Sequence, residues 1–211
     1  TVRNKVVKQV FKRMYDDGLI YQGHRVVNWC PRCHSTLADD EVEYSEENGK
    51  LYWIKYGPFV LATARPETKL GDTAVAVHPS DERYKDMVGK QYMIPGVLGE
   101  FEITVVADRS VDPEFGSGAV KVTPAHSFTD SETAQRHGIG MKQIIDEDGR
   151  MMDNCGKYAG MTTLEARKAI VEDMEKMGLI ERIEENYKHN LSVCYRCSST
   201  IEPIPSKQWF I

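Results

Sequence analysis

Two short segments of the chain are dense in groups that could bind or activate a substrate. The first, KVTPAHSFTD, runs from the end of a predicted strand into the first turn of a predicted helix, and its polar residues are Lys121, Thr123, His126, Ser127 and Asp130. A helix N-terminus presents free N–H groups and a positive dipole end, which favour a bound carboxylate, phosphate or developing oxyanion. Lys121 and Thr123 alternate with valines and therefore share one strand face. We expect a polar site here.

A nucleophilic serine is one interpretation of this segment. Ser127, His126 and Asp130 have the residue types of a hydrolytic triad, but closeness in sequence does not supply the geometry of a proton relay. A structural role explains two of them, because Ser127 can cap the helix and Asp130 can complement its dipole. Neither interpretation explains Lys121 and Thr123. The pattern favours a non-covalent polar site.

The second segment, ATARPETKLGD, has a similar layout. The apolar strand FVLATA ends at Arg65, and Pro66 suits the first position of a short helical turn. Thr63, Arg65 and Thr68 thus form a second polar cluster at a strand end. If the two clusters face each other, they enclose a polar pocket that water can reach.

Four of the five cysteines form two C-x-x-C pairs that lie far apart in the chain. The spacing directs two sulfurs of each pair at one point, so the pairs together can hold a tetrahedral Zn²⁺ ion. A redox role needs only one pair, and disulfides are disfavoured in a reducing compartment. We predict a structural Zn²⁺ site with the ligands Cys30, Cys33, Cys194 and Cys197; Cys155 is expected to be incidental. This site would close a stem from which residues from about 44 to 190 are looped out.

The composition suits a globular protein, with 41% hydrophobic and 28% charged residues in 211. The chain has no apolar run long enough to span a membrane and no signal-peptide pattern, so the default expectation is a cytoplasmic protein without membrane contact. A net charge of −5 argues against indiscriminate nucleic-acid binding. Residues 1–33 are nevertheless basic, which leaves open a directed contact with an anion or a solvated helix face. The chain resembles a piece excised from a longer one, because it lacks an initial Met and ends in an aromatic-rich run.

The periodicity of apolar residues predicts three helices and many short strands. The helices cover residues 1–17, the segment after the Ser127 cap as far as Gly138, and the segment from the Thr162–Glu165 capping box to Gly178. Asn48 and Gly49 form a predicted turn. The predicted strands are LYWIKY, FVLATA, TAVAVH, QYMI, FEITVVAD, GAVKVTPA and KQIID.

Many short strands with Gly, Pro and Asp between them indicate a barrel or a strongly curved sheet. We therefore expect an α+β fold, a β-barrel-like unit with peripheral helices on a stem closed by a pair of zinc knuckles that supply four cysteine ligands. The expected parts are a stem helix and first knuckle (residues 1–50), the barrel-like unit (51–185), and a return strand with the second knuckle (186–211).

Several long motifs occur in an order that is typical of one family. The chain resembles the connective-peptide insertion of class I valyl-tRNA synthetases in NWCPRCHSTLADDEVEY, TARPETKLGDTAVAVHPSDERY, DPEFGSGAVKVTPAH, DEDGR, YAGMTTLEARKAI, CYRCSSTIEP and SKQWF. Leucyl and isoleucyl enzymes carry related insertions and remain the alternative, but these motifs are more similar to the valyl type. The resemblance implies an editing domain that hydrolyses mischarged Thr-tRNA(Val). ATP belongs only to the parent enzyme, because the HIGH and KMSKS-type signatures are missing here.

The resemblance also implies roles for residues. Asp130 would anchor the α-ammonium of the substrate, and Lys121 would place positive charge near the carbonyl or the terminal phosphate of the tRNA. The attacking water would be activated by its position and by hydroxyls of the terminal adenosine, without a covalent serine. The implied substrate-binding residues are Thr63, Arg65, Thr68, Thr123, His126 and Ser127. The chain departs from the family at Ser127, where an Asp is usual.

The implied partners are the 3′ end of tRNA(Val) carrying threonine and the remainder of the synthetase chain. A competing hypothesis follows from the basic first 33 residues, namely a zinc-clamped tRNA-binding module that is inactive in isolation.

Overall fold

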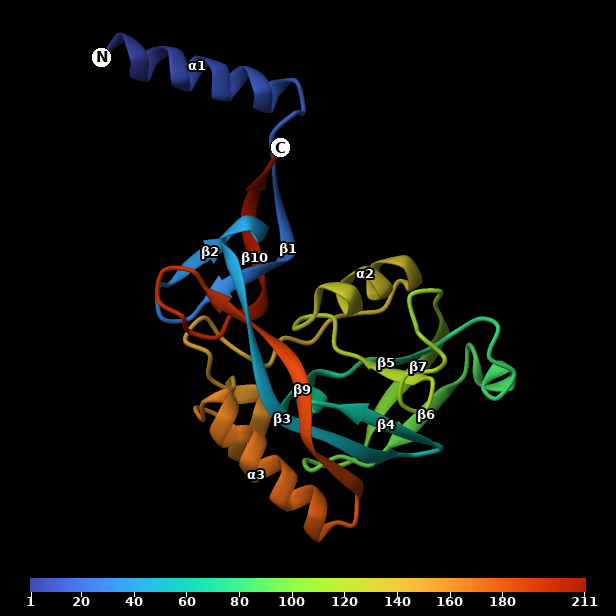
Figure 1. Ribbon diagram of the computed structural model, residues 1–211. Helices are drawn as coiled ribbons and strands as arrows, with labels where there is room; N and C mark the ends of the chain where they lie inside the picture. Colours follow the sequence, from blue (N-terminus) through green and yellow to red (C-terminus); the bar gives the residue numbers. More distant parts are fainter.

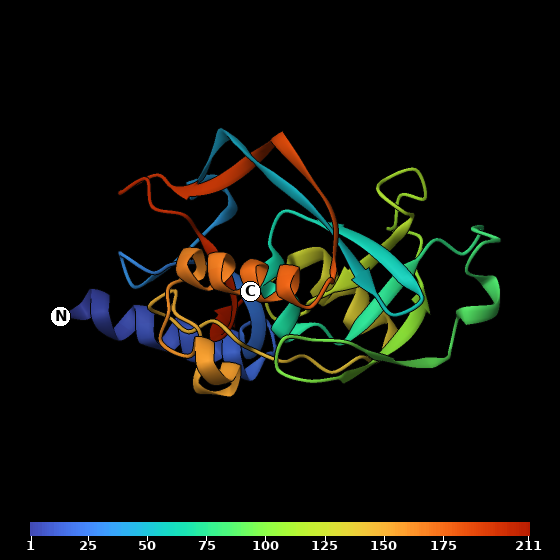
Figure 2. The ribbon, with the colours of Figure 1, turned by 90° about the horizontal axis from the view of Figure 1, so that it is seen from below.

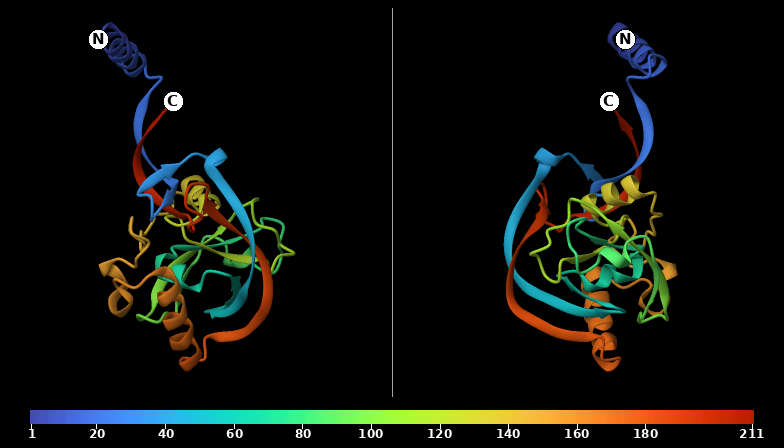
Figure 3. Two further views of the ribbon diagram at one scale, coloured as in Figure 1. Left: turned by 60° about the vertical axis from the view of Figure 1, so that its left-hand side comes forward. Right: turned by 90° about the vertical axis from the view of Figure 1, so that its right-hand side faces the viewer.

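The computed structural model describes residues 1–211, in which a narrow stem carries a larger body (Figure 1). The two ends of the chain build the stem, because β1 and β10 pair antiparallel from Tyr21 opposite Phe210 to Trp29 opposite Glu202. The stem elements are α1 (Val2–Asp16), β1 (Tyr21–Cys30), β2 (Ser35–Leu37), η1 (Asp39–Glu41) and β10 (Glu202–Phe210). Both chain ends lie on the side away from the body (Figure 3).

Helix α1 projects from the stem. Thr1 caps it by accepting a hydrogen bond from the Asn4 N–H, and the chain leaves the helix before Gly18, as the sequence predicts. None of its residues is buried. Its apolar stripe touches the stem through Phe11 and Tyr15, whose rings meet Trp209 edge-on at centroid distances of 5.1 and 5.9 Å.

A long two-stranded ribbon joins the stem to the body. It consists of β3 (Val42–Tyr56) and β9 (Ile180–Cys194), which pair antiparallel along most of their length. The predicted turn at Asn48 and Gly49 is wrong, because β3 continues through both residues and only its register shifts after Gly49. The His189 ring packs where a Gly49 side chain would begin, so glycine is needed there for close approach. Both strands run across the expected boundaries at residues 50 and 185.

The body is built on a four-stranded sheet of order β6-β7-β5-β8. Its strands are β5 (Ala74–Val77), β6 (Gln91–Ile94), β7 (Phe101–Ala107) and β8 (Ala119–Val122), while β4 (Phe59–Thr63) pairs with β3. β5 is parallel to β7 and antiparallel to β8. KQIID is not a strand, because only an isolated bridge joins Ile145 to Met151. The other predicted strands are present.

The α+β class is confirmed, whereas the sheets do not close into a barrel. Closure requires every strand to pair on both sides, but β4, β6 and β8 each lie at the edge of an open sheet. The body also contains short 3₁₀ segments and two helices, of which α2 packs against the edge strand β8: η2 (Pro66–Gly71), η3 (Lys85–Met87), α2 (Phe128–His137), η4 (Asp153–Tyr158) and α3 (Thr163–Lys176). No helix is both long and apolar enough to cross a membrane.

Both body helices begin and end as their caps predict. Ser127 caps α2 and Gly138 ends it, and Thr162 with Glu165 forms the capping box of α3. Viewed from below, α3 lies nearest the viewer (Figure 2). It buries Ile170 and Met174 against a core that includes Ile144 and Ile145. A second core lies between β3, β4 and the four-stranded sheet, so the strand ends that carry the polar segments are held rigidly.

Candidate functional site

Lys121 is the centre of a polar cluster inside the body. Its ammonium donates to Thr68 Oγ1 at 2.7 Å, to Thr123 Oγ1 at 2.5 Å and to Asp72 Oδ1 at 3.1 Å. Its side chain is 11% exposed. The structure therefore brings together three of the residues that the sequence singled out, Thr68, Lys121 and Thr123, from two distant segments.

Strand pairing explains this meeting. β8 lies antiparallel to β5 with Lys121 opposite Val75, and η2 leads directly into β5. Pro66 starts the turn of η2, and the Thr68 hydroxyl closes it by donating to the Arg65 carbonyl at 2.9 Å. The end of β8 and the turn of η2 consequently lie side by side.

Asp72 is a member of this cluster that sequence reasoning missed. Its carboxylate is buried and accepts hydrogen bonds from Lys121, from the Thr123 hydroxyl and from the Tyr56 hydroxyl, the last at 2.9 Å. In the sequence Asp72 follows Gly71, and a Gly-Asp pair is typical of a turn. Lys121 could have pointed to Asp72, because a lysine on the inner face of a strand needs a buried carboxylate nearby.

Asp130 lies beside the cluster, in the first turn of α2. Its Oδ2 accepts from the Thr123 N–H at 2.8 Å, and its own N–H donates to Ser127 Oγ at 3.3 Å. Burial raises the pKa of Asp130, although the nearby Lys121 charge and the Thr123 hydrogen bond act in the opposite direction. Asp130 lines a cavity of about 350 Å³, which Phe115 also lines.

Arg65, which is partly exposed, is held by ion pairs with two buried carboxylates. It donates to Glu202 at 2.6 Å and to Glu67 at 3.1 Å, and Glu67 accepts two further bonds from Arg167 at 2.8 and 2.9 Å. Burial alone would lower the pKa of Arg65, but the two carboxylates raise it above its ordinary value. Arg65 lines a second cavity, of about 770 Å³, between body and stem. Arg65 and Asp130 thus line different cavities.

The remaining two predicted site residues are bonded within the fold. Thr63 accepts the Arg65 N–H on its hydroxyl at 3.1 Å. His126 accepts the N–H groups of Ile144 and Ile145 on Nε2, so its Nδ1 carries the proton and donates to the Pro203 carbonyl at 3.0 Å. Burial lowers the pKa of His126 to about 4, which keeps the ring neutral. Neither ring nitrogen is free for a substrate.

The four paired cysteines meet at the junction of stem and ribbon. Their sulfurs all lie within 4.8 Å of one another, and Cys30 and Cys33 are each 3.5 Å from Cys197. Tetrahedral Zn–S bonds of about 2.3 Å place sulfurs about 3.8 Å apart, so the cluster fits this ion after small shifts. Hydrogen bonds from Ser199 lower the pKa of Cys197 to about 6, whereas burial raises the pKa of Cys30 and the hydrogen bond with Cys197 raises that of Cys33, so without a metal one thiol of the cluster ionises most readily. The four cysteines are positioned to hold a metal ion.

Comparison with known proteins assigns the family. The model of the tRNA synthetases of class I (I, L, M and V) matches residues 2–211. The chain belongs to this family. It is 52% identical to the valine--tRNA ligase of Thermotoga maritima, 50% to that of Petrotoga mobilis and 48% to that of Geobacter sulfurreducens, in each case over 99% of the chain. The resemblance to valyl-tRNA synthetases is confirmed. The chain spans only 24% of the length of each of these relatives.

Proposed function

We propose that this chain is the editing unit of a valyl-tRNA synthetase and that it hydrolyses the aminoacyl ester of Thr-tRNA(Val). The observation that carries the proposal is the buried Lys121 cluster, which sets a cation and two hydroxyls beside the carboxylate of Asp130. In this proposal residues 51–185 form the editing unit, residues 1–50 and 186–211 form the stem, and Zn²⁺ is the structural metal of the four cysteines. Ligation with ATP belongs to the remainder of the parent chain.

The geometry suits ester hydrolysis by positioned water. Asp130 would pair with the α-ammonium of the threonyl group, because a carboxylate and an ammonium form a strong, directed hydrogen bond. The Lys121 ammonium and the N-terminal N–H groups of α2 would stabilise the oxyanion that forms when water attacks the carbonyl. The bond between the carbonyl carbon and the ribose oxygen of the terminal adenosine then breaks, and the proton given up by the attacking water passes to that oxygen, so that the products are free threonine and the uncharged tRNA.

Selection of threonine over valine would follow from the hydrogen bonds of Lys121. All three N–H groups of its ammonium have partners in the structure. A substrate hydroxyl that binds the Lys121 ammonium must therefore displace one of its three partners. Threonine can supply that hydroxyl, whereas the methyl of valine would leave a buried charged donor unpaired, which costs about 1–3 kcal/mol or more.

The test is deacylation of Thr-tRNA(Val) and Val-tRNA(Val) by the purified chain. We expect hydrolysis of the threonyl ester only. Asp130→Ala should abolish it, because the ammonium loses its anchor, while Asp130→Asn should keep the fold and also lose activity. Glu132→Ala is the matched control, since Glu132 lies on the same helix with its side chain 72% exposed. No hydrolysis above buffer at high protein concentration, or full activity in Asp130→Ala, would contradict the proposal.

A second candidate is a zinc-clamped tRNA-binding module without activity of its own. It is favoured by the engagement of Arg65 by Glu67 and Glu202, and of Lys121 by its three partners, which leaves the site closed. The two proposals differ in solution. Binding of tRNA(Val) that weakens steeply with salt but gives no turnover supports the module.

A further inference from the structure

Lys69 is a buried amine without a hydrogen-bond partner. It lies in η2, next to Thr68, and only 2% of the residue is exposed. Its Nζ has no polar partner and lies 3.6 Å from the centre of the Tyr56 ring and 5.0 Å from that of Phe101. Burial of an unpaired amine is costly, so a lysine at this position needs an explanation beyond packing.

The groups around Lys69 connect it to the Lys121 cluster. From β3 the titratable group is Tyr56, from β7 only the apolar Phe101 approaches, and the charges that act on Lys69 are those of Asp72 and Lys121. Tyr56 donates its hydroxyl to Asp72 Oδ2, while Lys121 binds Asp72 Oδ1. The charges of two amines, Lys69 and Lys121, thus act on the buried carboxylate of Asp72.

We propose that Lys69 is a positioning residue for Lys121, and that the charge of Lys69 sets how firmly Asp72 holds the Lys121 ammonium. The inference rests on the proposed role of the Lys121 cluster in hydrolysis. Burial lowers the pKa of Lys69 to about 7, so the amine changes its charge near neutral pH.

The two states of Lys69 differ in electrostatics. When Lys69 is charged, two ammonium groups share one carboxylate and repel each other, which weakens the hold of Asp72 on Lys121. A charge over the Tyr56 ring also attracts the ring electrons. When Lys69 is neutral, Asp72 is balanced by Lys121 alone, and Lys121 is fixed between Thr68 and Thr123. Hydrolysis should therefore increase as pH rises through about 7.

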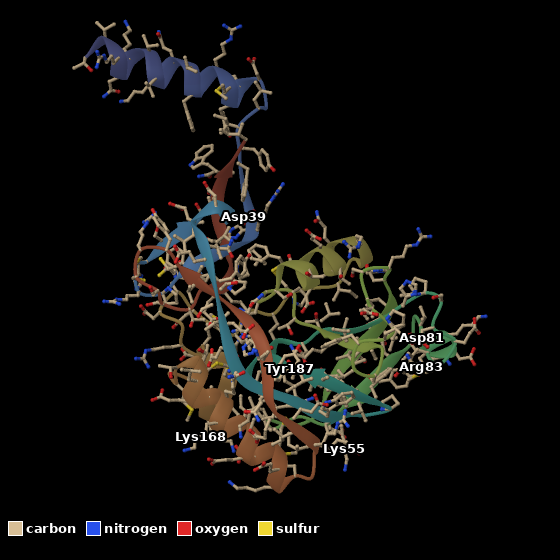
Figure 4. The ribbon with its side chains drawn as sticks, viewed as in Figure 1. Asp39, Lys55, Asp81, Arg83, Lys168 and Tyr187 are labelled. Atoms are coloured by element: carbon tan, nitrogen blue, oxygen red, sulfur yellow. The ribbon has the colours of Figure 1, made fainter.

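The first experiment does not depend on activity. The Cε and Nζ resonances of the lysines of the 211-residue chain are followed by NMR from pH 5.5 to 9. We expect Lys69 to titrate near pH 7 and the Lys121 resonances to shift with the same midpoint. Lys69→Met should abolish that shift. Lys55→Met is the matched control, because Lys55 is an exposed lysine of β3 next to Tyr56 (Figure 4), and it should leave the shift intact. Lys121 resonances that do not respond to Lys69 would overturn the proposal.

The second experiment measures hydrolysis of Thr-tRNA(Val) from pH 6 to 8.5. Between pH 6 and pH 8.5 the ratio of the wild-type rate to the Lys69→Met rate should rise by up to about tenfold. A group with a pKa near 7 is about 90% charged at pH 6, so its neutral fraction rises from about one tenth to nearly one. A ratio that is constant with pH would contradict the inference. Tyr56→Phe keeps the ring but removes the hydroxyl from Asp72, and should reduce the rate while keeping the pH response. Absence of hydrolysis by the wild type at every pH would refute the proposed function, and the NMR titration would still decide the role of Lys69.

Discussion

Replacing Lys69 by methionine should make the protein more stable at neutral pH. The pKa of Lys69 falls from its ordinary value of 10.5 to about 7 because the amine is buried. Between these values the unfolded chain binds more protons than the folded one, so folding stability rises with pH. The unfavourable contribution of Lys69 is therefore largest at and below about pH 7 and vanishes above about pH 10.5. A methionine at residue 69 does not titrate and removes this dependence.

The expected magnitude follows from the pKa shift. Each pKa unit corresponds to about 1.4 kcal/mol, so the shift represents about 4 kcal/mol of destabilisation at pH 7. The charged amine recovers about 1 kcal/mol from its contact with the Tyr56 ring. Methionine has a similar length and makes favourable contacts with aromatic rings. The net gain from Lys69→Met should be about 3 kcal/mol at pH 7 and close to zero near pH 10.5.

Urea unfolding of the wild type, Lys69→Met and Lys55→Met at several pH values measures this gain. The exposed control should differ from the wild type by less than about 0.5 kcal/mol throughout. A gain in Lys69→Met that is the same at pH 7 and pH 10 would show better packing rather than removal of a buried charge. No gain at pH 7 would refute the reasoning.

Two further predictions concern the stem and the ion-pair network. Metal analysis should find one Zn²⁺ per chain, lost in Cys30→Ser or Cys197→Ser, since each removes a thiolate ligand; a fully folded, metal-free wild type would contradict the site. Glu67→Gln should destabilise the protein by about 3 kcal/mol, because two partly buried arginines lose their common, fully buried carboxylate. Thermal unfolding measures that loss, the exposed Glu172→Gln on α3 should show none, and an unchanged melting temperature in Glu67→Gln would refute it.

Elements whose signals are local were predictable from the sequence. The α2 and α3 helices begin at Ser127 and Thr162 because those side chains satisfy free N–H groups within their own first turn. Each C-x-x-C pair directs its own two sulfurs at one point, as the spacing predicts, while the pairing of β1 with β10 and of β3 with β9 brings the two pairs together.

The errors arose where distant partners decide the structure. The acidic start of β3 has the composition of a loop, yet its backbone pairs with β9, and that ladder carries the strand through Gly49. KQIID resembles a strand, but Ile144 and Ile145 are both fully buried and their N–H groups bind His126. N–H groups that bind a side chain are not available for the ladder of a sheet. Asp72 was missed because its partners come from β3 and β8, which no local pattern reveals.

The same cluster explains how one site could use both cavities. Asp130 lines the smaller cavity and Arg65 the larger, and the Lys121 cluster lies between these residues through the bonds to Thr68 and Thr123. In the proposed reaction a substrate hydroxyl displaces one of these bonds, so it opens the cluster as it binds. A valyl group cannot make that exchange without leaving the ammonium unpaired. Opening of the site and recognition of threonine would then be the same event, in which the bonds of Lys121 to Thr68 or Thr123 are exchanged while Asp72 keeps the ammonium in place.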